Sequence, residues 1–127
     1  MKQMVRSNQA PKAIGTYSQA VKAGNTVYLS GQIPLVPESM EVVAGGIEAQ
    51  IRQVFENLKA VATAAGGTLD NAVKLTVYLT DLAHFPKVNE IMATYFQEPY
   101  PARAAIQISR LPKDVLVEID AIMFLGD

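Results

Sequence analysis

The chain contains no cysteine and no tryptophan, and it has a single histidine, His84, among its 127 residues. The lack of cysteine excludes disulfides, a thiol nucleophile and cysteine-ligated zinc, and nothing indicates an oxidising compartment. We interpret His84 as a surface turn residue rather than a general base, because no nucleophile is recognisable beside it. We expect no metal site, since histidines and carboxylates do not cluster in the sequence.

The chain also lacks a strong charge of either sign and long apolar runs. Its 11 Lys and Arg against 12 Asp and Glu leave a net charge of −1, which gives no electrostatic reason to bind nucleic acid or an anionic membrane. No apolar run approaches membrane-spanning length, and residues 1–11 lack the apolar core of a signal peptide. We therefore expect a cytoplasmic protein without nucleic-acid or membrane partners, folded as a single domain over residues 1–127.

What the sequence does contain is clear hydrophobic periodicity. Apolar residues spaced by three and four predict a helix over 47–65 and a shorter one over 86–97. Alternation predicts strands over 25–31, 72–80, 102–109 and 115–124, with 17–22 as a hairpin partner of the first and 33–44 as a loop.

This order, β-β-α-β-α-β-β, predicts an α+β fold in which two helices pack on one face of a mixed sheet. No helix is left for the opposite face, so we expect a second copy of the protein to cover it. The large side chains predicted on that uncovered face are Tyr28, Tyr78, Leu116, Ile122 and Phe124.

Two charges of opposite sign, Arg103 and Glu118, lie inside predicted strands, where an unpaired charge is costly. If the 111–114 turn joins these strands as a hairpin, the two residues lie on paired strands. From the residues alone a cross-strand ion pair is the favoured interpretation. The alternative is a site in which Arg103 holds a small anion, Glu118 transfers protons and Ala105 leaves room for the ligand. Gly31 supports this alternative, because glycine lets a ligand approach the backbone closely.

Beyond these patterns, the sequence closely resembles the RidA/YjgF family of enamine/imine deaminases over nearly its whole length. The resemblance is carried by segments 10–20, 27–34, 50–61, 73–81, 101–103 and 111–119. It implies a chorismate-mutase-like fold assembled as a homotrimer, with sites at the subunit interfaces. It also implies cofactor-free and metal-free hydrolysis of 2-aminoacrylate and 2-aminocrotonate, through 2-iminopropanoate and 2-iminobutanoate, to 2-oxo acids and ammonia.

The resemblance also implies roles for individual residues. Arg103 matches the arginine that clamps the substrate carboxylate, and Glu118 matches the acid that orients or activates water. The positions that match the substrate-binding pocket are Tyr17, Ser30, Gly31, Asn89 and Ala105.

Ala105 departs from the family pattern, because most members of the deaminase branch have cysteine at that position. In the family scheme the backbone at this position supplies hydrogen bonds, so alanine is compatible with activity and could shift substrate preference. The main alternative is a non-catalytic protein of the same fold that binds or senses a 2-oxo acid. An RNA-cleaving activity is disfavoured by the net charge of −1.

Overall fold

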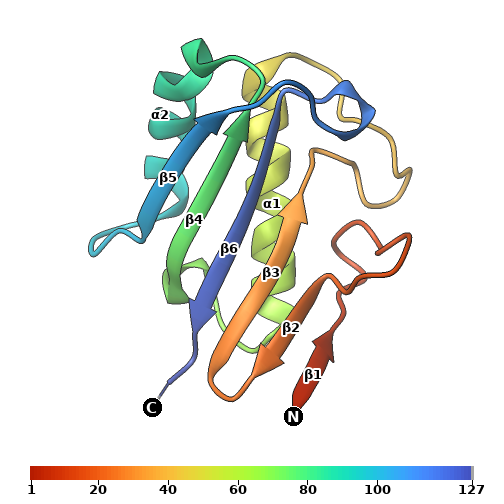
Figure 1. The fold of residues 1–127 in the computed structure, drawn as a ribbon, viewed down its shortest axis with the longest axis vertical. Coiled ribbons are helices and arrows are strands. Elements are labelled where there is room, and N and C mark those ends of the chain that lie inside the picture. Colours follow the sequence, from red (N-terminus) through yellow and green to blue (C-terminus); the bar gives the residue numbers. More distant parts are fainter. Residues whose placement is uncertain (127) are drawn as a thin grey trace.

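The computed structural model describes residues 1–126, which form one mixed six-stranded sheet with two helices (Figure 1). The elements in chain order are β1 (Lys2–Val5), β2 (Ala20–Ala23), β3 (Thr26–Gln32), α1 (Ile47–Ala64), β4 (Ala72–Leu79), α2 (Phe85–Tyr95), β5 (Ala102–Gln107) and β6 (Val117–Phe124). The strand order across the sheet is β1-β2-β3-β6-β4-β5, and only the β4–β5 pair is parallel.

The predicted α+β class is confirmed, with both helices behind the same face of the sheet in Figure 1. Both helices and the strands predicted from 25, 72, 102 and 115 onward agree with the structure to within two residues at each end, and 33–44 contains no helix or strand. The predicted hairpin partner, 17–22, is only partly a strand, because β2 begins at Ala20. The sequence pattern missed β1, a four-residue strand whose first three residues are exposed and therefore show no alternation.

The core lies between the sheet and the helices. Alternate strand residues point toward α1 and α2, and the apolar stripe of α1 packs onto them. Complete burial of one large apolar side chain in this layer stabilises the fold by about 1.5–3 kcal/mol. Residues that are completely buried in this layer include Val27, Ile51, Phe55, Leu58, Leu75 and Ile119.

The expected hairpin between residues 102–109 and 115–124 is wrong. β4 lies between these two strands, pairing parallel with β5 and antiparallel with β6. The burial patterns give the physical reason. Alternate residues of β6 are fully buried, as a central strand requires, whereas five of the six residues of β5 are exposed, as suits an edge strand.

The opposite face of the sheet carries no helix. Three large apolar side chains on it remain substantially exposed, namely Tyr28 at 51%, Phe124 at 51% and Ile106 at 44%. Tyr78, Leu116 and Ile122 are half-buried. Within residues 1–126, none of the helices has the length and apolar character needed to cross a membrane.

Candidate functional site

The two charged residues predicted to act together, Arg103 and Glu118, lie on opposite faces of the sheet. Arg103 pairs in register with the buried Leu75, so its side chain is on the helix side. Glu118 lies between two buried residues of β6 and therefore points to the open side. No ion pair among residues 1–126 includes either one. The cross-strand ion pair is therefore wrong, and one copy of the chain does not bring the two groups together.

Arg103 is held by side chains of α2. Its Nη1 donates to Oδ1 of Asn89 at 2.9 Å and approaches Sδ of Met92 at 3.6 Å. Its Cζ lies 4.6 Å from the ring centroid of Phe85, a cation–π contact. All of these contacts are with neutral groups, so the positive charge of Arg103 is not neutralised by a carboxylate among the described residues.

Two hollows meet at Arg103. One, of about 400 Å³, is also lined by Asn89 and Tyr100. The other, of about 440 Å³, is also lined by Phe85 and Ala105. The structure therefore brings Asn89 and Ala105 together with Arg103, and we refer to these three residues as the arginine half-site.

The other four predicted residues, Tyr17, Ser30, Gly31 and Glu118, line a single cavity of about 450 Å³. We call this group the glutamate half-site. It is formed where β3 and β6 meet the loops that follow β3 and precede β2. The structure thus divides the seven predicted site residues into two clusters.

A β-bulge shapes the glutamate half-site. Leu29 pairs with Ala121 and Gln32 with Ile119, so Ser30 and Gly31 together oppose the single residue Asp120. The bulge brings the backbone of Gly31 against the Glu118 side chain. A Cβ atom at Gly31 would lie 2.9 Å from Cδ of Glu118 and would collide with the carboxylate. A side chain at this position would therefore displace the Glu118 carboxylate.

Gln19 fixes the loop that carries Tyr17, and sequence reasoning missed it. Gln19 is only 4% exposed. Its side-chain amide donates to the carbonyl of Pro11 at 2.7 Å and accepts from the amide of Ser7 at 2.6 Å. Nearby, the Ser30 hydroxyl donates to the carbonyl of Ser18 at 2.6 Å. The only sequence signal was a polar residue inside the segment 17–22, predicted to be extended, and this does not distinguish a buried amide from an exposed one.

The electrostatics of the open face raise the pKa of Glu118 above its ordinary value. Burial is the main cause that raises the pKa of Glu118, and the nearby Asp120 carboxylate raises it further. Asp120 accepts a hydrogen bond of 2.9 Å from the Tyr78 hydroxyl, and this bond is the main cause that raises the pKa of Tyr78. A carboxyl group with a raised pKa in a cavity is typical of a proton-transfer residue.

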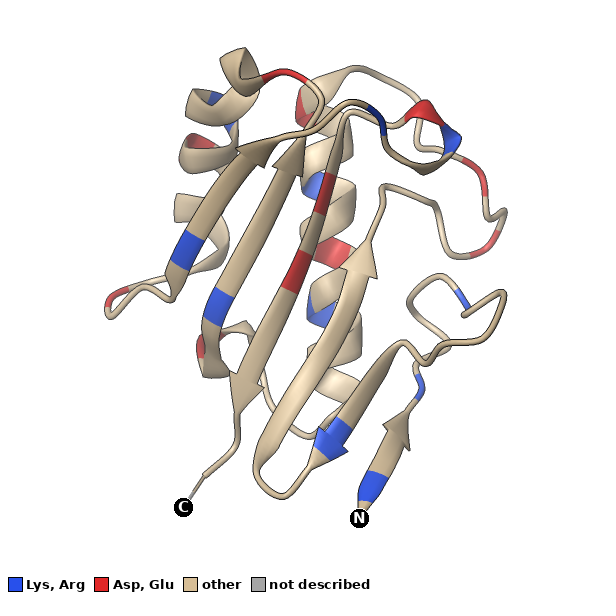
Figure 2. Cartoon of the chain, in the orientation of Figure 1, with Lys and Arg blue, Asp and Glu red and all other residues tan. Residues whose placement is uncertain are grey.

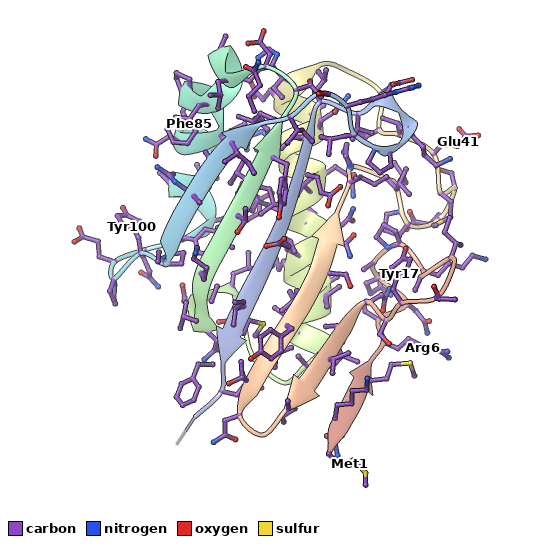
Figure 3. All side chains as sticks on the ribbon, viewed as in Figure 1. Met1, Arg6, Tyr17, Glu41, Phe85 and Tyr100 are labelled. Carbon is purple, nitrogen blue, oxygen red and sulfur yellow. The ribbon has the colours of Figure 1, made fainter. Side chains whose placement is uncertain are left out.

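The two half-sites are laterally separated. Figure 3 shows Tyr17 beside the β1–β3 end of the sheet, and Phe85 and Tyr100 beside β5 at the opposite edge. In Figure 2 the acidic segments of β6 lie near the middle of the sheet, and the basic segment of β5 lies at its edge. Residues 1–126 contain no group of three or more histidines and carboxylates able to hold a metal ion, so the structure offers no candidate ligand set.

Comparisons with known proteins agree with this architecture. Residues 7–124 match the family model described as Endoribonuclease L-PSP. A RutC family protein of Pyrococcus horikoshii is 53% identical over 124 residues, covering 98% of each chain. The 2-iminobutanoate/2-iminopropanoate deaminase of Mus musculus is 45% identical over 126 residues, which cover 99% of this chain and 93% of that protein.

A solved structure, RidA from the Antarctic bacterium Psychrobacter sp. PAMC 21119, superposes with a TM-score of 0.93 at 53% identity, covering 96% of this chain and 98% of that one. The family match spans most of the chain, and the relatives align over almost their full length. Sequence and fold therefore agree that this chain belongs to the RidA/YjgF family.

Proposed function

We propose that the protein is a deaminase that hydrolyses short-lived 2-imino acids and their enamine tautomers to 2-oxo acids and ammonia. The observation that carries the proposal is a pair of half-sites, one suited to binding an anion and the other suited to proton transfer. Among residues 1–126, Arg103 has a charge without a carboxylate partner, and Glu118 is a cavity carboxyl group with a raised pKa. The name of the Mus musculus relative supports the same chemistry.

In this proposal the site is completed between two copies of the chain, in a homotrimer. The exposed side chains of the helix-free face, Tyr28, Ile106 and Phe124, support association through that face. An arginine half-site at the edge strand of one copy would then lie against the glutamate half-site of the next. A closed ring requires such a heterologous contact, in which two different surfaces of the subunit meet.

The reaction divides between the two half-sites. Arg103 holds the carboxylate of the imine through its planar guanidinium. Asn89 and Phe85 orient the guanidinium. Glu118 accepts a proton from water as the water oxygen adds to C2, and the C=N electron pair moves to nitrogen. Return of that proton to nitrogen gives an amino alcohol. A second proton then moves from its hydroxyl group to nitrogen through Glu118, the C–N bond breaks, the oxygen electron pair forms the C2 carbonyl, and ammonia leaves. The atoms balance without an oxidant or reductant.

Ala105 fits this scheme because none of these steps needs a thiol. Its small side chain shares a hollow with Arg103 and Phe85. In this scheme Ala105 leaves room for the substrate and contributes backbone groups, and its side chain takes no part in the reaction. Tyr17, Ser30 and Gly31 bind the substrate from the glutamate side. The net charge of −1 gives no support to nuclease chemistry, despite the description of the family model.

The test is ammonia release while a threonine dehydratase generates 2-aminocrotonate in the assay. The wild-type protein should accelerate release over the buffer background. Arg103→Ala should lose most of that acceleration, because removing one partner of a desolvated charge contact costs about 2–5 kcal/mol. Arg110→Ala is the matched control, since Arg110 is exposed and pairs only with Asp114.

Two outcomes would contradict the proposal. Near-wild-type activity of Arg103→Ala would show that the arginine half-site is not needed for the reaction. Binding of 2-oxobutanoate by the wild-type protein without any acceleration would instead favour the alternative of a 2-oxo acid binding or sensing protein.

A further inference from the structure

The cavity that holds Glu118 is lined by polar residues and by a group of apolar residues that come from different elements. The strands supply Ser30, Gly31 and Glu118. The loop that follows β3 supplies Ile33, Leu35 and Met40, which lie on the same cavity. These three residues form an apolar wall of the cavity.

The apolar wall is fixed by hydrogen bonds to a buried side chain of α1. Asn57 on α1 is completely buried, and its side-chain amide donates to the carbonyls of Ile33 at 3.3 Å and Leu35 at 3.0 Å. Leu35 also forms an isolated bridge with Val42. The wall is therefore built into the fold, with its polar groups satisfied internally.

Met40 occupies this wall with an unusual backbone conformation. Its φ of 60° lies in the left-handed region, where a Cβ atom is unfavourable and glycine is the usual residue. The turn that imposes this conformation is closed by hydrogen bonds from the amide of Met40 to the carbonyl of Val36 at 2.7 Å and from the amide of Val36 to the carbonyl of Glu41 at 2.8 Å. A methionine side chain is present where the backbone would be less strained without one.

Left-handed conformations concentrate at this cavity. Among residues 1–126, only Met40, Lys113 and Asp114 adopt a positive φ without being glycine. Met40 and Lys113 both line the Glu118 cavity, and Asp114 follows Lys113 directly. Strained residues that persist in a fold cluster at ligand sites, where their side chains are needed.

We propose that Met40 is a specificity-determining residue, and that the cavity selects 2-imino acids with apolar side chains longer than methyl or ethyl. The substrate side chain lies along Ile33, Leu35 and Met40 while C2 lies beside Glu118. This inference rests on the proposed deaminase function and adds its substrate class. Each additional buried methylene should improve kcat/KM by roughly fourfold.

The experiment compares two imines of different length. D-Amino-acid oxidase, with catalase present, generates 2-iminopropanoate from D-alanine and 2-iminohexanoate from D-norleucine. Competition with semicarbazide, which traps the remaining imine, gives kcat/KM for each. The wild-type protein should favour 2-iminohexanoate by roughly tenfold or more, given three additional methylenes. Met40→Gly should reduce that preference, measured as the ratio of the two kcat/KM values, by about fourfold or more.

Matched variants separate the side chain from the backbone. Glycine adopts a φ of 60° without strain, so Met40→Gly should fold. Glu38→Gly adds the same loop flexibility away from the cavity and should keep the wild-type preference. Met40→Leu keeps an apolar side chain of similar size and should also keep it. Calorimetric titration with pyruvate and 2-oxohexanoate compares the affinities for a short and a long side chain without turnover.

The failures are distinguishable. Turnover of both imines without a preference for the longer one would overturn this inference and leave the proposed function standing. An unchanged preference in Met40→Gly would overturn the role of Met40. No turnover of either imine would overturn both proposals.

Discussion

The two half-sites differ in how the sheet supports their charges. Arg103 lies on the exposed edge strand β5, where the side chains of α2 hold it. Glu118 lies on the central strand β6 between the fully buried Val117 and Ile119, with the Gly31 bulge against it. The carboxyl group is therefore positioned by the backbone, whereas the guanidinium is positioned by side chains. This difference suggests that the glutamate half-site is preorganised for chemistry and that the arginine half-site receives the substrate carboxylate.

Replacement of Glu118 by Gln tests the chemical half of this comparison and should have the largest effect. The variant keeps the shape of the side chain but cannot accept a proton. We expect kcat to fall by about 10²–10⁴-fold, the usual contribution of a general acid–base group. The affinity for 2-oxobutanoate, measured by calorimetric titration, should change little. Equal loss of binding and turnover would assign Glu118 a structural role instead.

Replacement of Gly31 by Ala tests whether the backbone positions the carboxylate. The added methyl group would collide with the Glu118 side chain and displace it. Displacement of a catalytic group by about 1 Å costs up to roughly 10²-fold, so we expect kcat/KM to fall by about ten- to a hundredfold. Gly46→Ala is the matched control, because a Cβ atom at Gly46 would meet nothing within 4 Å. Similar activity of Gly31→Ala and Gly46→Ala would show that the bulge does not position Glu118.

Replacement of Asp120 by Asn should have the smallest effect, a shift in pH dependence. Glu118 must be ionised to accept a proton, so activity should rise with pH through its raised pKa. The negative charge of Asp120 is one cause of that raised pKa, and its removal should move the acidic limb of kcat/KM to lower pH. The limb should stay above the ordinary value of 4.5, because burial is the larger cause.

Asp114→Asn is the control for the pH profile, since Asp114 is exposed and paired with Arg110. An acidic limb that does not move in Asp120→Asn would mean that Glu118 does not govern the pH dependence, or that Asp120 does not act on it.

The fold elements could be predicted from the sequence because each depends on a local pattern. The stripe of α1 and the alternation of β4 are visible over one segment, and burial of their apolar faces decides their structure. Strand order was not predictable in the same way. The 111–114 turn is compatible with a hairpin, but in the fold β4 lies between β5 and β6 and pairs with both.

The site residues likewise divide into those that a local sequence pattern indicates and those that depend on strand pairing. Gly31 could be recognised because glycine at a strand end indicates close approach. The bulge that makes it necessary depends on a register between β3 and β6, which are far apart in sequence. The buried amides of Gln19 and Asn57 bond carbonyls of neighbouring loops, so their roles are visible only in three dimensions. The placement of Arg103 and Glu118 on opposite faces likewise follows from pairing, which the sequence pattern left open.

The measurement that tests the central claim most directly is complementation between two inactive variants. Arg103→Ala and Glu118→Gln, with different tags, are expressed together, and assemblies that carry both tags are assayed for ammonia release. In a closed ring of three copies, about one site in three joins an intact Arg103 to an intact Glu118. We expect the mixed assemblies to recover about a third of wild-type activity. Activity no greater than that of either variant alone would contradict a site shared between copies.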